Sequence, residues 1–282
     1  MNIFDPRKVK ALALDLDGTL LDRGVLAPGT LDILKRVSDL GIEIMLATGR
    51  PRRDVPDELL AMPELRYLIT LNGSCVADTT AGRYISRSSL DYPLAQELLA
   101  FLKEHIQYVH LMCDDRTYVR PVCAMHTRTH FEAQLTPEAL AEAYETLYIV
   151  DAPMDHMKEH AIVIDKVVVN LGDAAVAQSM LSVVARQFGV ETAVMEKSNF
   201  EITARGVNKA TGIEQIAQHV GFAMGETVAI GDSGNDILML QSVGYPIAMG
   251  NASDEVKSLA RMIAPPVTEG GAVTVLEELF FS

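Results

Sequence analysis

Two aspartates separated by a single residue are the first side chains in this sequence whose spacing suggests chemistry. Asp15 and Asp17 end the apolar run of ALALDLDGTLL, residues 11–21, and Gly18 follows them. Side chains alternate between the faces of a strand, so both carboxylates leave this predicted strand on the same side, and the glycine allows a tight turn beyond them. Two like charges held together need a proton, a cation or an ionic substrate to compensate them. The pair therefore predicts metal or phosphate chemistry.

A second polar group lies near the C-terminus in AIGDSGNDILML, residues 229–240. Asp232 follows another predicted strand, and Asn235 and Asp236 stand where the next helix is expected to begin. Taken alone, Asn235 is a candidate helix cap, and Asp236 is a carboxylate that balances the helix dipole. An isolated Asp-x-Asp-Gly is likewise often a solvated turn, but a second acidic group at another strand end favours the catalytic interpretation.

Two further positions are suited to binding an anion. In LATGR, the Thr48 hydroxyl and the N–H groups of the turn at Gly49 can face a phosphate oxygen, although a hydroxyl before a glycine turn is also common without a ligand. Lys209 opens a predicted helix, where the helix dipole disfavours a cation, so an external anion is a fitting partner for it. An exposed lysine is the ordinary alternative.

The elements that must position these residues alternate between strand and helix. Before residue 84 the predicted order is a strand at 10–16, a helix at 30–41, a strand at 42–48, a helix at 54–62 and a strand at 67–71. From residue 207 the alternation returns, with strands at 226–230, 246–249 and 261–264 between helices. This pattern predicts an α/β, Rossmann-like core with a parallel sheet and helices on both faces. Asp15, Thr48, Asn72 and Asp232 each follow a strand, so we expect them at the carboxyl edge of one sheet.

The middle of the chain has a different pattern. Strand signals at 108–113 and 117–120 flank a short turn, and further strands are expected at 166–171, 192–195 and 200–203, with helices at 137–147 and 174–188. Strands joined by short turns, with helices between them, predict a separate α+β unit inserted into the parallel-sheet unit. We expect a catalytic core at 1–83 and 196–282 and an inserted cap domain at 84–195.

Composition excludes several classes of protein. The net charge of −14 argues against a nucleic-acid partner, which needs a basic face. No run approaches the ~18 apolar residues of a membrane helix, and the N-terminus lacks the apolar segment of a secretory signal, so we expect no membrane association and a cytoplasmic location. Three cysteines without CxxC spacing argue against a disulfide framework or a zinc ribbon. The oligomeric state cannot be predicted.

The motifs together resemble a known family. DLDGTLLD, ATGR, GVNKATGI and GDSGNDILML, in this order and at these separations, resemble the four signature motifs of the haloacid dehalogenase superfamily of phosphohydrolases. The insertion after the second motif, with TLNGS before it and AMGNA after the fourth motif, is similar to the Cof-type branch (subclass IIB), which has a mixed α/β cap of the C2 type and includes sugar phosphatases. One position departs from that family's pattern, because Ala210 rather than glycine follows the motif-three lysine.

This resemblance implies a Mg²⁺-dependent phosphatase of small phosphorylated metabolites, such as sugar phosphates, pyridoxal phosphate or flavin mononucleotide. It implies that Asp15 is the nucleophile and that Asp17 is the general acid and then the base. The implied Mg²⁺ ligands are the Asp15 carboxylate, the Asp17 backbone carbonyl and Asp232. The implied phosphate ligands are Thr48, Gly49, Lys209 and Asn235, with Asp236 orienting Lys209 or a metal-bound water, and with Arg50 and Asn72 as weaker candidates for substrate contact.

Basic residues of the cap are candidates for substrate selection. Arg120 and Arg128 lie close together in the sequence of an acidic chain, and we expect part of this stretch to face the polar end of the substrate.

Three other functions are compatible with the motifs. The first is a phosphotransferase or phosphomutase of the same superfamily, which passes the phosphoryl group to a hydroxyl instead of water. The second is a receiver-like signalling module, which would keep a lasting aspartyl-phosphate. The third is a non-catalytic binding protein on the same fold. Product analysis distinguishes the first from a hydrolase, and a stable phosphoprotein without turnover would identify the second.

Overall fold

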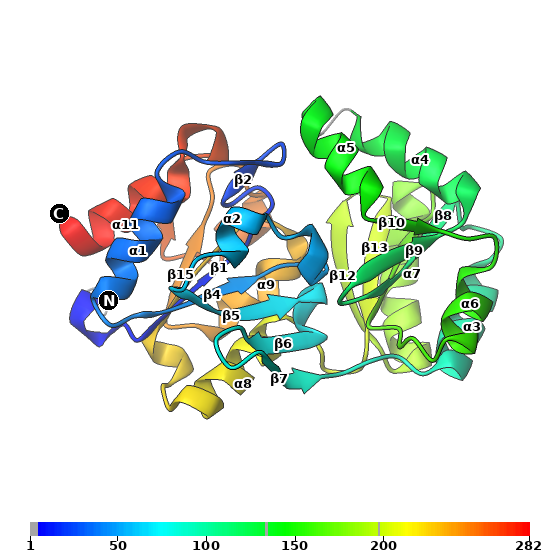
Figure 1. Ribbon diagram of the computed structural model, residues 1–282, viewed down its shortest axis with the longest axis horizontal. Helices are drawn as coiled ribbons and strands as arrows, with labels where there is room; N and C mark the ends of the chain where they lie inside the picture. The colour runs from blue at the N-terminus through cyan, green and yellow to red at the C-terminus, as the bar shows by residue number, and fades with distance from the viewer. Residues whose placement is uncertain (1–4, 133–134, 197) are drawn as a thin grey trace.

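The computed structural model describes residues 5–132, 135–196 and 198–282, which form two layered units, each built on its own β-sheet (Figure 1). The first and the last of the described residues lie in the first unit, and the second unit is formed by the middle of the sequence. The predicted α/β class, with a sheet rich in parallel strands and helices on both of its faces, is confirmed. Within the described residues, no helix combines the length and apolarity needed to cross a membrane.

The first sheet has the strand order β16-β15-β14-β1-β4-β5-β6-β7. Its parallel strands are β1 Ala11–Leu14, β4 Glu43–Ala47, β5 Leu65–Thr70, β14 Thr227–Gly231, β15 Tyr245–Ala248 and β16 Met262–Ile263. The antiparallel strands β6 Cys75–Asp78 and β7 Arg83–Arg87 extend it at one edge, a hairpin that the sequence pattern did not predict. Strands β14, β1, β4 and β5 are therefore consecutive neighbours at the centre of this sheet.

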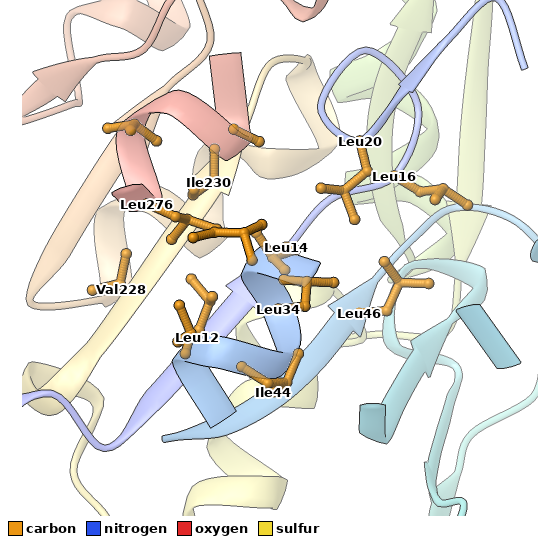
Figure 2. Close-up of a cluster of buried hydrophobic side chains, with 14 of the residues drawn as sticks. Leu12, Leu14, Leu16, Leu20, Leu34, Ile44, Leu46, Val228, Ile230 and Leu276 are labelled. Carbon is orange, nitrogen blue, oxygen red and sulfur yellow. The ribbon is translucent and has the colours of Figure 1, made fainter. Parts of the chain in front are cut away.

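Helices cover both faces of this sheet because its central strands are apolar on both sides. Leu12 and Leu14 of β1 pack beneath α1 Thr30–Asp39 and α11 Gly271–Phe281, and Ala11 and Ala13 face α8 Lys209–Val220 and α9 Ile237–Ser242. Figure 2 shows the first cluster, which joins Leu12 and Leu14 to Leu34, Ile44, Leu46, Val228, Ile230 and Leu276. Fully burying each such leucine or isoleucine stabilises the fold by about 1.5–3 kcal/mol. The ends of the central strands are thus held on a rigid base.

The second sheet has the order β10-β9-β8-β11-β13-β12 and is mostly antiparallel. Its strands are β8 Tyr108–Cys113, β9 Arg116–Val119, β10 Leu147–Ile149, β11 Lys166–Asn170, β12 Glu191–Glu196 and β13 Asn199–Thr203. One face, with Val167, Val169, Phe200 and Ile202, packs against α3 Tyr92–Leu102 and α7 Ala174–Phe188. The period of two in a strand turns the alternate residues of β8, β11 and β13 toward the first unit.

Helices α4 Pro121–Phe131 and α5 Pro137–Glu145 lie on the other side of the second sheet, and α5 reaches toward the first unit (Figure 1). There it meets a small flap formed by β2 Leu21–Asp22 and β3 Val25–Leu26. The amide of Thr136 donates to the Arg23 carbonyl at 3.2 Å, and Arg23 Nη2 donates to the Leu135 carbonyl at 3.4 Å. The short helices α2 Asp57–Leu60, α6 Pro153–Glu159 and α10 Asp254–Lys257 complete the α-helical elements of the described residues.

The sheets suggest where the inserted unit begins and ends. Strand β7 continues the first sheet to Arg87, beyond the expected boundary at residue 83, and β13 belongs to the second sheet up to Thr203, beyond the expected boundary at residue 195. We propose that the cap domain consists of residues 88–203 and the core of the rest.

Candidate active site

The carboxyl ends of four neighbouring strands bring the predicted residues together. Asp15 follows β1, Thr48 follows β4, Asn72 lies two residues beyond β5, and Asp232 follows β14. Since these strands are parallel and adjacent, their ends meet at one edge of the sheet, where α/β folds bind ligands.

A buried lysine connects two of the carboxylates. Lys209 Nζ donates to Asp15 Oδ1 at 2.6 Å and to Asp236 Oδ1 at 2.7 Å, and all three side chains are at most 5% exposed. Lys209 is the first residue of α8, whose position is fixed by a capping box in which Asn208 and Thr211 exchange side-chain and backbone hydrogen bonds. Burial, followed by the nearby Asp236 charge, raises the pKa of Asp15, and Lys209 opposes this rise. The lysine therefore reduces the cost of burying Asp15 in its charged form.

Three carboxylates converge beside this pair. Asp15, Asp232 and Asp236 each offer an oxygen within 4.8 Å of the others. Burial and the Asp236 charge raise the pKa of Asp232 to about 7. Asp15 Oδ2 and Asp232 Oδ1 are buried, and neither has a hydrogen-bond partner in the described part of the chain. Asp236 Oδ2, by contrast, accepts from the amides of Asp232 and Ser233. The two unpaired oxygens fit a hard divalent cation such as Mg²⁺, which prefers oxygen ligands.

Gly18 and Asn251 hold the Asp232 carboxylate in place. Asn251 Nδ2 donates to Asp232 Oδ2 at 3.1 Å and to the Gly18 carbonyl at 2.9 Å. Gly18 has φ +78°, and a Cβ at this position would collide with the Asp232 carboxylate. Glycine is thus required here both by the backbone conformation and by the close approach of the acidic side chain.

Asp17 lies at the cavity side of the cluster and is held by an arginine. Arg50 Nη2 donates to Asp17 Oδ1 at 2.6 Å and Arg50 Nε donates to Asp17 Oδ2 at 2.8 Å. The Asp17 side chain remains 54% exposed, whereas that of Arg50 is 26% exposed and also donates to the Asp54 carbonyl. Arg50, which the sequence indicated as a substrate contact, thus binds Asp17 in this structure. Such a two-point contact fixes the direction in which the carboxylate points.

The loop after Thr48 is joined to an unusual turn at Asn72. Leu71, Asn72 and Gly73 have consecutive φ values of +50°, +58° and +102°, a conformation that costs about 1–3 kcal/mol for each non-glycine residue. The amide of Asn72 donates to the Thr48 carbonyl at 3.0 Å, and the amide of Leu71 donates to the Arg50 carbonyl at 3.1 Å. The Asn72 side chain is thereby directed into the site, where its Oδ1 accepts from Asn235 Nδ2 at 3.2 Å.

A cavity of about 400 Å³ lies above these residues, between the two units. Asp15, Asp17, Gly49, Arg50, Asp232 and Asn235 line its floor. Its upper wall is largely apolar and aromatic, formed by Tyr108, Met112, Ala139, Leu140, Ala143, Tyr144, Leu147 and Val168. Arg128 also lines it, while Arg120 precedes α4, is exposed and is not among its lining residues.

Two charged residues of the second sheet reach the same floor and were not identified from the sequence. Lys166 of β11 and Glu201 of β13 form an ion pair and both line the cavity. The available signal was a charged residue in an otherwise apolar strand, since Glu201 stands between Phe200 and Ile202. Such a placement is rare without a buried partner.

Known proteins share both the sequence pattern and the fold. The sequence profile of the haloacid dehalogenase-like hydrolases matches residues 12–276. The 5-amino-6-(5-phospho-D-ribitylamino)uracil phosphatase of Bacillus subtilis strain 168 is 24% identical over 269 residues, covering 95% of this chain and 94% of that protein. The pyridoxal phosphate phosphatase of Escherichia coli K12 is 27% identical over 262 residues, covering 90% and 92%. The structure of the phosphatase BT1666 from Bacteroides thetaiotaomicron has a TM-score of 0.75 at 27% identity and covers 97% of this chain and 96% of its own.

Proposed function

The chain belongs to the haloacid dehalogenase-like hydrolases and is a phosphatase of that family, and we propose that it hydrolyses small phosphorylated metabolites with Mg²⁺ through an aspartyl-phosphate. The observation that carries this proposal is the buried Asp15 carboxylate at the cavity floor. One of its oxygens is bound by Lys209 and the other has no partner among the described residues.

The reaction divides one difficult displacement into two. An Asp15 oxygen attacks phosphorus, the bond to the leaving oxygen breaks, and Asp17 gives that oxygen a proton. Asp17 then takes a proton from water as the water attacks the aspartyl-phosphate, which releases inorganic phosphate and restores Asp15. The Arg50 contact supports this role because it holds Asp17 at the cavity side of Asp15.

The residues around the phosphate would stabilise its charge. The proposed ligands are the Thr48 hydroxyl, the turn at Gly49, Lys209 and Asn235. Gly49 and Asn235 line the cavity with Asp15, and Lys209 contacts Asp15, so donors from these residues would stabilise the charge that grows in the transition state. Asp15, Asp232 and the backbone carbonyl of Asp17 would hold Mg²⁺, which neutralises negative charge on the phosphate and the carboxylates when bound.

The lining of the cavity supports a proposal about the class of substrate. Its apolar and aromatic upper wall suits a leaving group with a flat or apolar face, and its polar floor suits the phosphate. The related enzymes named above act, by their names, on pyridoxal phosphate and on a phosphorylated ribitylaminouracil. We therefore place pyridoxal phosphate and flavin mononucleotide ahead of simple sugar phosphates as substrates.

Phosphate release from these compounds, with Mg²⁺ or with a chelator, tests the proposal. Turnover should require Mg²⁺ and should vanish in Asp15→Asn, which removes the nucleophile with little change in shape. Stoichiometric transfer of the phosphoryl group to an added alcohol without free phosphate would identify a phosphotransferase. A phosphoprotein that persists without turnover would contradict hydrolysis altogether.

A further inference from the structure

The ion pair of Lys166 and Glu201 occupies an unusual position at the boundary between the two units. Both side chains are fully buried, at 2% and 1% exposure, on the face of the second sheet that is turned toward the first unit. Neighbouring strand residues such as Val167 and Ile202 point to the opposite face, into the cap's own hydrophobic core. Strand alternation therefore directs both side chains of the pair toward the candidate active site.

Both members of the pair contact the core through loops that surround the phosphate position. Lys166 Nζ donates to the Gly49 carbonyl at 2.5 Å. Glu201 Oε2 accepts from Asn72 Nδ2 at 2.6 Å, and Asn72 in turn accepts from Asn235. A chain of hydrogen bonds thus runs from the second sheet to two proposed phosphate ligands, Gly49 and Asn235.

Stability alone is a weak explanation for this arrangement. A buried ion pair often contributes no more than well-packed apolar residues would, because removing two charges from water is costly. A second ion pair already joins the units, between Arg87, whose side chain is 34% exposed, and the buried Asp165 at 2.7 Å, and neither of these residues lines the cavity. A carboxylate beside a phosphate site also repels the ligand unless its charge is compensated, as Lys166 does here.

We propose that Lys166 and Glu201 are a positioning pair that fixes Gly49, Asn72 and Asn235 from the cap, so that the phosphate site is complete only when the cap is seated. This inference rests on the proposed function, because it assigns the pair a role at the same site. Seating the cap would then organise the phosphate ligands at the moment when water is excluded from the cavity.

Binding of inorganic phosphate in the presence of Mg²⁺, measured by calorimetry, tests the pair without relying on turnover. Lys166→Met, Glu201→Gln and the double variant should each raise the Kd for phosphate by ~10–100-fold, the range expected for losing charged hydrogen bonds. The double variant should be no worse than the worse single variant, because the two residues act as one unit. kcat/KM for p-nitrophenyl phosphate should fall in parallel. A thermal unfolding measurement on each variant identifies any variant that does not fold.

Arg87→Gln is the matched control because it breaks the other ion pair between the units, whose carboxylate, Asp165, is also buried. It should lower the melting temperature while leaving the Kd for phosphate within about twofold of wild type. A folded Glu201→Gln that binds phosphate as tightly as wild type, or an equal loss in Arg87→Gln, would overturn the inference. If the wild type binds phosphate but hydrolyses none of the phosphate esters, the proposed function fails while the binding comparison still decides the role of the pair.

Discussion

Replacing Lys209 by methionine should destabilise the protein strongly, and in a manner that depends on pH. Methionine keeps the unbranched, apolar part of the lysine side chain but removes the cation that contacts Asp15 and Asp236 at 2.6 and 2.7 Å. Three carboxylates would then converge within 4.8 Å without a compensating positive charge from the chain. Removing one partner of a buried ion pair costs about 3–5 kcal/mol in the free energy of unfolding.

The corresponding change in melting temperature follows from the size of the chain. An unfolding entropy of about 2.1 cal/mol/K per residue over 282 residues gives about 0.6 kcal/mol/K, so the loss should be about 5–8 °C for a single transition. The pKa values of Asp15 and Asp232 are already raised in the native state, and removing Lys209 raises them further. The native state of the variant therefore binds more protons than the native state of wild type. The stability of the variant relative to wild type consequently falls as pH rises.

Thermal unfolding at about pH 5 and about pH 8, with Mg²⁺ or with a chelator, measures this effect. The loss of melting temperature in Lys209→Met should be largest at the higher pH without Mg²⁺. Mg²⁺ should restore part of this loss by supplying positive charge. Lys35→Met is the control, because its ion pair with Asp39 is exposed and should be worth less than about 1 kcal/mol. A loss of equal size at both pH values, or no loss at the higher one, would refute the electrostatic reasoning.

Other changes give equally definite expectations. Without a divalent cation, the free energy of unfolding should fall as pH rises from about 4 to about 7, because burial and a nearby carboxylate raise the pKa of Asp232 to about 7, so that the native state holds a proton that the unfolded chain has lost. The stabilisation by Mg²⁺ should grow over the same interval, and thermal unfolding in a pH series checks both. Gly18→Ala should lower the affinity for Mg²⁺ by at least ~10-fold, because the methyl group collides with the Asp232 carboxylate, and a Mg²⁺ titration of thermal stability measures this. Arg50→Gln should reduce kcat/KM by ~10–100-fold in steady-state assays with p-nitrophenyl phosphate, because Asp17 loses the two hydrogen bonds that direct it. Phe200→Ala should cost about 3–5 kcal/mol in denaturant unfolding, since this ring is fully buried in the cap's core; an unchanged midpoint would contradict its packing role.

The core of the fold was predictable because its signals are local. An apolar run followed by a polar residue marks the end of each central strand, and the rule for parallel sheets then gathers Asp15, Thr48 and Asp232 at one edge. The helices between these strands also carry local signals, such as Gly221, which ends α8 in a left-handed conformation.

The elements that were missed depend on longer-range pairing. The hairpin of β6 and β7 is antiparallel, and a pattern of alternating strands and helices gives no reason to expect it. Lys166 contacts Gly49 across 117 residues of sequence, and Glu201 contacts Asn72 across 129. Such contacts follow from how the cap sits on the core, which no local pattern encodes. The contact of Arg50 with Asp17 is of the same kind, because its two residues lie on different strand ends.

The contact between α5 and the β2–β3 flap closes one side of the cavity, which Gly24, Leu135 and Ala139 line. Two hydrogen bonds join Arg23 of the flap to Leu135 and Thr136. Ala139 approaches Gly24 so closely that an added Cβ on the glycine would lie 2.6 Å from the alanine Cβ. At about 0.5–1.5 kcal/mol each, these two bonds contribute about 1–3 kcal/mol to holding this side of the cavity closed. The contacts of Lys166 and Glu201 with the loops at the cavity floor are buried and charged. The side of the cavity at the flap is therefore held less tightly than its floor.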